Sequence, residues 1–308
     1  MDETSLREAT NSQASGVHSR AGLVYGLSAY AMWGVFPLYF RAVAEVPPLV
    51  ILCHRIFWSS LFLGIVVSAR GEWRLIGPVL GKRRNIVLLS AGAVLIALNW
   101  LIFIYSVASR QVLQASLGYF INPLLSVALG VIFLRERLRR WQWVAVIIAT
   151  LAVVNLTLRG LGFPWIAVSL AITFGFYGLV RKLVDIHSLH GLLIESSLLL
   201  PVALIFGIVL PTGKIATTTW AILSLSGVIT AVPLLCFGAA LRRLPLSMMG
   251  FLQYIGPTLQ FLVAIFLFHE PLNRAKSVSF GLCWLAIVVY MADSLLSRQP
   301  PPVADEPE

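Results

Sequence analysis

Two charged residues stand inside apolar stretches of this chain, where a charge is costly. Arg55 lies about seven residues into the apolar run 48–68, and Glu195 lies in the run 191–210. A charge at the centre of a bilayer costs at least ~2.5–3.5 kcal/mol, so each one indicates a function or a specific partner. Arg55 could bind a carboxylate or another anionic group. Alternatively, it is a structural arginine that binds backbone carbonyls or extends outward beside His54.

Glu195 is the matching candidate for an acidic function. It could carry a coupling proton or bind a cationic group of a solute. Alternatively, it is an interfacial glutamate in the first turn of its helix, where the helix dipole favours a negative charge. Arg55 and Glu195 are expected at opposite membrane faces, so we expect no direct salt bridge between them.

Uncharged polar side chains recur near the centres of two apolar runs. Tyr119 and Asn122 lie three residues apart in the run 112–134, and Gln253 and Gln260 lie seven apart, so each pair shares one helix face. Such faces suit a wet cavity for a solute. They also suit interhelical hydrogen bonds, which contribute ~0.6 kcal/mol on average. The predicted cavity wall consists of Arg55, Asn99, Trp100, Tyr119, Asn122, Tyr177, Gln253 and Tyr254.

Patterns typical of enzymes are missing from the sequence. It has no phosphate-binding glycine loop, no H-E-x-x-H motif and no nucleophile elbow. The three cysteines stand singly in apolar runs, and the H-x-x-H spacing of His187 and His190 has only Asp185 nearby. We therefore expect no enzymatic activity, no cofactor and no metal centre.

Two other functions stay open on sequence grounds. A membrane-embedded enzyme acting on a lipid-linked substrate would need acid–base or metal-binding residues clustered at one interface, whereas the polar groups here are dispersed. A sensor that binds the same ligand without transporting it would differ from a transporter only in the absence of flux.

The composition places these residues in a membrane protein. Hydrophobic residues make up 58% of the 308 residues and charged residues 12%, against ~25% charged in an ordinary soluble domain. Uncharged runs reach the ~20 residues needed to cross ~30 Å of hydrocarbon. The net charge of +10 comes mostly from Lys and Arg in short loops, where they set topology and contact lipid headgroups. We expect membrane lipid, and no nucleic acid, as a partner.

The apolar runs predict an all-α fold of ten transmembrane helices. By the rule that cytoplasmic loops are rich in Lys and Arg, 16 of these residues fall in segments predicted to be cytoplasmic and six in outer segments. Both termini, including the polar tails 1–20 and 297–308, are then cytoplasmic. The predicted helices lie near 21–40, 48–68, 85–106, 112–134, 141–158, 164–181, 191–210, 218–240, 246–268 and 278–296.

The sequence divides into two predicted repeats, residues 21–158 and residues 164–296, and residues 120–154 match residues 254–288 at a shift of 134. In this register Pro123 matches Pro257 and Glu136 matches Glu270. Each half holds five predicted helices, an odd number, so the second half enters the membrane from the opposite side. Such inverted repeats are typical of secondary transporters, whose central site is exposed to each face in turn.

The chain resembles the RarD branch of the EamA family, within the drug/metabolite transporter superfamily. The resemblance is carried by Asn99–Phe103, Ala115–Leu124, Phe176–Lys182, Val232–Phe237 and Gly250–Leu259. It implies two EamA repeats, residence in a bacterial inner membrane, and a role in export or resistance-linked transport, with a name tied to chloramphenicol sensitivity. It implies no particular substrate.

These observations together predict a secondary active transporter. We expect it to export a small organic metabolite or drug-like solute by alternating access, with H⁺ as the coupling ion and Glu195 as its carrier. Since both halves lie in one chain, we expect a monomer.

Overall fold

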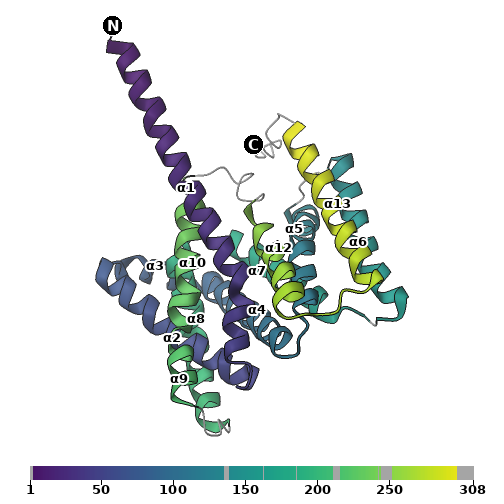
Figure 1. The fold of residues 1–308 in the computed structure, drawn as a ribbon. Helices are drawn as coiled ribbons and strands as arrows, with labels where there is room; N and C mark the ends of the chain where they lie inside the picture. Colours follow the sequence, from purple (N-terminus) through teal and green to yellow (C-terminus); the bar gives the residue numbers. More distant parts are fainter. Residues whose placement is uncertain are drawn as a thin grey trace.

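The computed structural model describes residues 3–134, 139–161, 163–184, 186–210, 216–241, 243 and 252–296. Within them the chain is helical, and no strand occurs in these ranges (Figure 1). Seven of the described helices are long and apolar enough to cross a membrane, and two shorter ones, Trp165–Arg181 and Ile255–Leu267, are also apolar. The seven are Arg20–Ala42, Pro48–Arg70, Arg83–Ala108, Arg140–Arg159, Leu189–Val209, Thr217–Ala240 and Arg274–Asp293.

The helices follow the apolar runs because hydrocarbon offers no hydrogen-bond partners to an open backbone. In the first half they are α1 (Glu3–Ala42), α2 (Pro48–Arg70), α4 (Arg83–Ala108), α5 (Val112–Leu134) and α6 (Arg140–Leu156). The connection from α2 to α4 holds η1 (Trp73–Leu75) and α3 (Gly77–Leu80), and the π-helical segment η2 (Thr157–Leu161) follows α6.

The second half of the chain is also helical in its described residues. It contains α7 (Trp165–Lys182), α8 (Ser188–Val209), α9 (Thr217–Ser224) with α10 (Ser226–Leu241), α12 (Ile255–Leu262) with the π-helical η3 (Val263–Leu267), and α13 (Arg274–Leu296). The predicted span 218–240 corresponds to two helices that meet at Leu225, and α1 extends N-terminally beyond its predicted start at residue 21. Residues 246–251 of the ninth predicted range lie outside the described residues.

Local chemistry explains where α2 begins and ends. Proline is favoured at the first position of a helix because its fixed φ suits the turn and its missing N–H would have no partner there; α2 begins at Pro48. Gly71 follows its last residue with φ 64°, the left-handed conformation that glycine adopts without a steric penalty, and its N–H bonds the carbonyl of Ser68.

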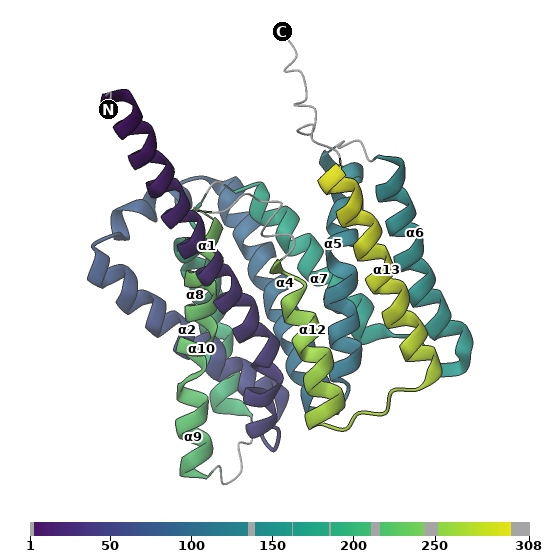
Figure 2. The same cartoon turned by 45° about the horizontal axis from the view of Figure 1, so that its top comes forward.

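Helices of the first half of the chain pack against helices of the second half. α1 packs against α10 and α12, while α7 packs against α4 and α5. α2 packs against both α8 and α10, α4 also contacts α8, α5 contacts α12, and α6 packs against α13. The α6–α13 pair forms one side of the molecule in Figure 2, and α2, α8 and α10 lie together on the other.

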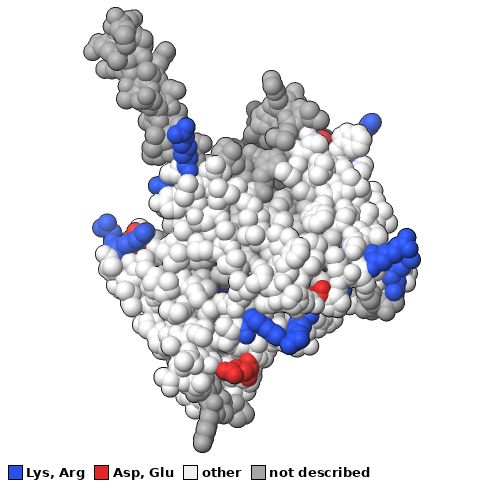
Figure 3. Space-filling model, viewed as in Figure 1, with Lys and Arg blue, Asp and Glu red and all other residues white. Residues whose placement is uncertain are grey.

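Charged side chains are sparse on the surface of this bundle. Figure 3 shows them in a few separate patches with broad uncharged surface between the patches. Large apolar side chains such as Ile65, Val87 and Ile208 are exposed, as expected of side chains that face lipid. In both ribbon views α1 begins and α13 ends at the same end of the bundle (Figures 1 and 2).

Candidate functional site

Arg55, in α2, is buried in the protein interior with only 4% of its surface exposed. Its Nε donates a hydrogen bond of 3.0 Å to Thr230 Oγ1 on α10. The guanidinium carbon lies 4.1 Å from the ring centre of Trp100 on α4, a cation–π contact. The terminal nitrogens donate no hydrogen bond to any residue in the described ranges. One edge of the guanidinium is therefore fixed by Thr230, and the other edge donates no hydrogen bond to the described residues.

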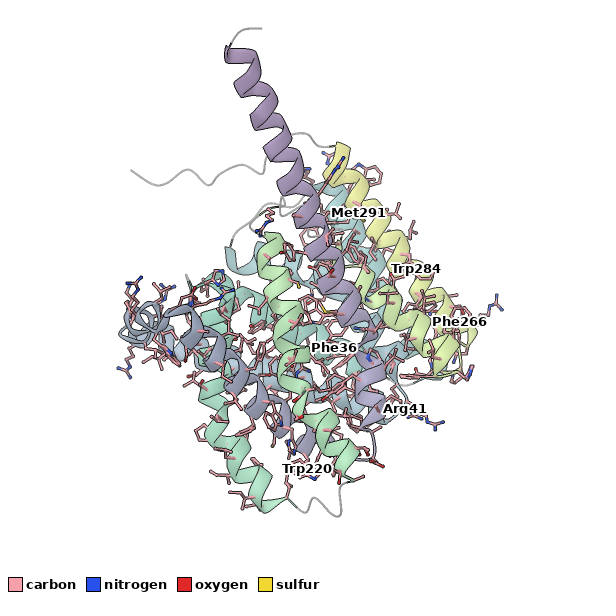
Figure 4. All side chains as sticks on the ribbon, turned by 60° about the vertical axis from the view of Figure 1, so that its left-hand side comes forward. Phe36, Arg41, Trp220, Phe266, Trp284 and Met291 are labelled. Carbon is pink, nitrogen blue, oxygen red and sulfur yellow. The ribbon has the colours of Figure 1, made fainter. Side chains whose placement is uncertain are left out.

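Three helices hold the guanidinium in place. Phe36 and Phe40 lie one turn apart on α1, so both rings face α2, at 5.7 and 5.5 Å from the Arg55 guanidinium carbon. Figure 4 labels Phe36 and, further along α1, Arg41. Trp100 is buried on α4. The sequence predicts Trp100 in a cavity wall, and the structure places its ring against the Arg55 guanidinium.

Asn99 organises a hydrogen-bonded cluster next to this arginine. Its side-chain amide donates to the Leu170 carbonyl and to Thr173 Oγ1, both on α7, at 3.0 and 2.9 Å. Its carbonyl accepts a hydrogen bond of 3.2 Å from the Tyr119 hydroxyl on α5. Asn99 thus ties α4, α5 and α7 together, and the predicted residues Asn99, Trp100 and Tyr119 belong to one region.

Glu195 forms a second charged centre and is fully buried. Its Oε1 lies 3.6 Å from Arg181 Nη1, and its Oε2 accepts a hydrogen bond of 3.0 Å from the Tyr177 hydroxyl. Tyr177 and Arg181 are four residues apart on α7, so both point at α8. The predicted residues Tyr177 and Glu195 are therefore in contact, and the ion-pair partner of Glu195 is Arg181.

Two glycines make room for this ion pair. A Cβ at Gly92 on α4 would lie 2.9 Å from Glu195 Oε1, and a Cβ at Gly191 on α8 would overlap the Arg181 guanidinium. Any larger residue at either position would displace one of the two charges. The backbone of α4 and α8 is thus shaped around the charged pair.

Aromatic rings connect the two charged centres through the interior. From Phe40 beside Arg55, successive ring centres lie 5.8 Å apart to Phe103 and 5.8 Å to Tyr119. The series continues with ring centres 6.2 Å apart from Tyr119 to Phe174 and 6.1 Å apart from Phe174 to Tyr177. The Tyr177 hydroxyl in turn contacts Glu195.

Three further predicted residues lie apart from both centres. Tyr254 stacks on Phe120 with ring centres 6.5 Å apart, and its hydroxyl is buried without a hydrogen-bond partner in the described structure. Asn122 is buried, and its side-chain oxygen likewise has no described partner. Gln253 is half-buried. None of these three has a contact that joins it to Arg55 or Glu195 among the described residues.

Sequence reasoning missed Arg181 and Thr230. Arg181 stands at the end of an apolar run, where a basic residue is expected as a topology signal, although its spacing of four from Tyr177 places the two on one helix face. Thr230 had no comparable signal, because a threonine in an apolar helix commonly bonds its own backbone.

Glu270 is a third buried carboxylate, in the connection between η3 and α13. It accepts hydrogen bonds from the backbone N–H groups of Val112 and Leu113, at 2.7 and 2.9 Å, and so caps the first turn of α5. A helix of the first half is thereby held by a side chain of the second. Glu136, its counterpart in the predicted repeat, lies outside the described residues.

Several known proteins with similar sequences are named transporters, and others are named RarD. A protein of Vibrio cholerae named an uncharacterized transporter is 43% identical over 284 residues, covering 90% of this chain and 94% of its own. The RarD proteins of Salmonella typhimurium and Escherichia coli are 44% and 42% identical over 288 residues, covering 91% of this chain and 98% and 97% of theirs. One protein crystal structure matches with TM-score 0.60 and 18% identity over 91% of this chain and 99% of its own, which shows a shared fold.

The helical fold and these relatives define a multi-pass membrane transporter. Residues 20–158 match the EamA-like transporter family. The chain belongs to that family, and over most of its length it is similar to the proteins named RarD.

Proposed function

We propose that this transporter is a secondary active carrier that exports a small organic metabolite or drug-like solute across a bacterial inner membrane. It works by alternating access between two inverted halves, and the export is coupled to H⁺ through Glu195. The ten-span topology, cytoplasmic termini and monomeric state expected from the sequence are part of this proposal.

The helix bounds support two related halves. α6 and α13 begin at Arg140 and Arg274, 134 residues apart, which is the register of the sequence repeat. α2 and α8 begin at Pro48 and Ser188, 140 residues apart, because the first half has the longer connection that contains η1 and α3.

The packing supports a two-fold relation between these halves. Exchanging each helix for its counterpart turns the contact of α1 with α10 into that of α7 with α4, and the contact of α1 with α12 into that of α7 with α5. In the pairs α2–α8, α5–α12 and α6–α13 the two helices are each other's counterparts, so the exchange leaves these contacts unchanged. Two opposed halves of this kind can exchange conformations and so expose one site to either side.

The observation that carries the proposal is the placement of the two buried charges. Arg55 is the eighth residue of α2 and Glu195 is the eighth residue of α8, so they occupy equivalent positions in the two halves. In an inverted repeat, equivalent positions lie at opposite depths. One half thus holds a buried cation, and the other holds a buried carboxylate that is paired with Arg181. The ring series from Phe40 to Tyr177 lies between them.

Glu195 suits the role of proton carrier. A buried carboxylate beside an arginine can exist ionised, paired with Arg181, or protonated, with Arg181 released to solvent, where 16% of its side chain is already exposed. Intramembrane acidic residues of this kind serve as proton relays in transporters.

The test is flux in proteoliposomes with an imposed pH gradient. Purified protein is reconstituted, and efflux of solutes identified by comparing cells and medium with the protein absent or overproduced is measured. We expect the gradient to accelerate flux in the wild type and to have no effect in Glu195→Gln. Flux of an identified solute that ignores the gradient, or that responds equally in Glu195→Gln, would contradict coupling through Glu195. Saturable binding without flux would indicate a sensor.

A further inference from the structure

Arg55 has no counter-ion in the described part of the chain. The structure describes the side chains of Glu45, Glu72, Glu195, Glu270 and Asp293. Each has a different partner: Thr219, His190, Arg181, the backbone of α5 and Arg139, respectively. The remaining acidic residues stand in segments that the sequence places on the cytoplasmic side, whereas Arg55 is predicted in the outer half of its helix.

The second half of the chain provides an internal comparison. There the buried charge, Glu195, is neutralised by Arg181, the residue before the last of α7. The equivalent residue of the first half, the one before the last of α1, is Arg41, which is also a cation and lies over the Phe268 ring, 5.7 Å from its centre. The same positions that form an ion pair in one half therefore hold two like charges in the other.

A buried cation without a counter-ion is a large energetic cost that proteins rarely leave uncompensated. Thr230 and the Trp100 ring compensate part of it, but neither carries a negative charge. We infer that the missing counter-ion is supplied by the solute: Arg55 binds the carboxylate of an organic monoanion whose apolar or aromatic body lies among the surrounding rings. This rests on the proposed transport function and specifies its substrate class.

Charge balance favours a carboxylate over a phosphate. Arg41 lies over the Phe268 ring and interacts electrostatically with Glu270, so its charge is already partly balanced. Arg55 then provides one unbalanced positive charge, which one negative charge neutralises, and a phosphate dianion would leave a net charge in the same interior. A carboxylate also fits the edge of the guanidinium, which can donate two parallel hydrogen bonds to its oxygens. Beyond the guanidinium, Phe36, Phe40 and Phe103 offer apolar surface.

The test compares matched pairs of small molecules on the full chain in detergent or nanodiscs. The probes are phenylacetate against phenylacetamide, indole-3-acetate against indole-3-acetamide, and phenyl phosphate. Binding is followed by thermal shift and by tryptophan fluorescence, since Trp100 contacts the arginine. We expect the carboxylates to bind at least about tenfold more tightly than their amides, the value of one charge-assisted hydrogen bond. Phenyl phosphate as a dianion should bind more weakly.

Variants assign this preference to Arg55. Arg55→Gln should abolish the carboxylate preference, and Arg55→Lys, which keeps the charge and loses the planar fork, should retain part of it. Arg159→Gln, at an exposed arginine, should bind as the wild type does. If Arg55→Gln fails to fold, the preference for carboxylate over amide in the wild type still tests the proposal. No binding by either carboxylate, equal binding of amides, or a preference that survives Arg55→Gln would overturn it.

The proposed transport function and the proposed carboxylate site can be refuted independently of each other. Carboxylate binding that depends on Arg55 but gives no flux in proteoliposomes overturns the transport function and leaves the binding site. Flux of a neutral solute that is unchanged in Arg55→Gln overturns the carboxylate site and leaves transport.

Discussion

At the scale of single residues, two buried charges of opposite sign are accommodated in different ways. Glu195 has an arginine partner, a tyrosine hydroxyl and two glycines that leave it space. Arg55 has a threonine hydroxyl and three aromatic rings. The first arrangement is neutral on its own, whereas the second needs an anion, so the two centres are suited to different ligands.

The glycine at position 92 gives a prediction for the Glu195 centre. Gly92→Ala places a methyl group 2.9 Å from the Glu195 carboxylate, so the ion pair with Arg181 must shift. We expect a loss of about 1–3 kcal/mol in unfolding free energy, measured by thermal or chemical unfolding in detergent, as for other overpacked interiors.

Gly178→Ala is the matched control, because an added Cβ at this position on α7 meets no atom within 4 Å. It should be neutral or slightly stabilising. Equal effects of the two substitutions would contradict a close fit of α4 around Glu195.

At the scale of elements, the apolar pattern of the sequence was sufficient to predict most helix positions. Uncharged runs of membrane length leave the backbone no alternative to a helix. The division of the eighth predicted span at Leu225 was not predictable, because the flanking Ser224, Ser226 and Gly227 are uncharged and small residues of this kind also occur inside continuous membrane helices. The two charged residues could be proposed as functional from their positions inside apolar runs. Their contact partners could not, because they depend on which helices pack against each other, and a single sequence does not contain that information.

The connection around Glu270 gives a prediction about how α5 is anchored. Glu270→Ala removes the acceptor for two backbone N–H groups, and a buried donor without a partner costs about 1–3 kcal/mol. We expect Glu270→Ala to lower the thermal stability of the chain. Glu270→Gln keeps one acceptor oxygen and should lower it less. Equal stability of Glu270→Ala and the wild type would show that α5 does not depend on this cap.

The same residue should make stability depend on pH. Burial raises the pKa of Glu270 above its usual 4.5, an effect that the backbone N–H groups of Leu113 and Val112, together with Lys276 and Arg41, only partly offset. The folded chain therefore holds this proton more tightly than the unfolded chain. The resulting stabilisation is complete below pH 4.5 and is lost as the pH rises through the pKa of the folded state.

The measurement is the difference in unfolding free energy between the wild type and Glu270→Gln, which cancels the other titrating groups. This difference should rise as the pH is lowered from neutral towards 4.5. A difference that stays constant or falls over that range would contradict burial as the dominant effect on Glu270.

At the scale of the whole molecule, the proposed arrangement of two five-helix halves threaded in opposite senses accounts for the sequence repeat, the exchange of helix contacts and the opposite charges at equivalent positions. Each half alone would leave its charged residue without the helices that surround it: Arg55 needs Thr230 from the second half, and Glu195 needs the space beside Gly92 from the first. The halves are therefore expected to act as one unit.

The opposed orientation of the halves is tested most directly at Arg140 and Arg274. These exposed residues begin α6 and α13 and are equivalent in the repeat. Arg140→Cys and Arg274→Cys are introduced separately after the three native cysteines are replaced, and each is labelled in intact cells with a membrane-impermeant thiol reagent. We expect the cysteine at position 274 to be labelled from outside, and the one at position 140 only after the cells are opened. Labelling of both from the same side would contradict the inverted repeat and, with it, the alternating-access mechanism.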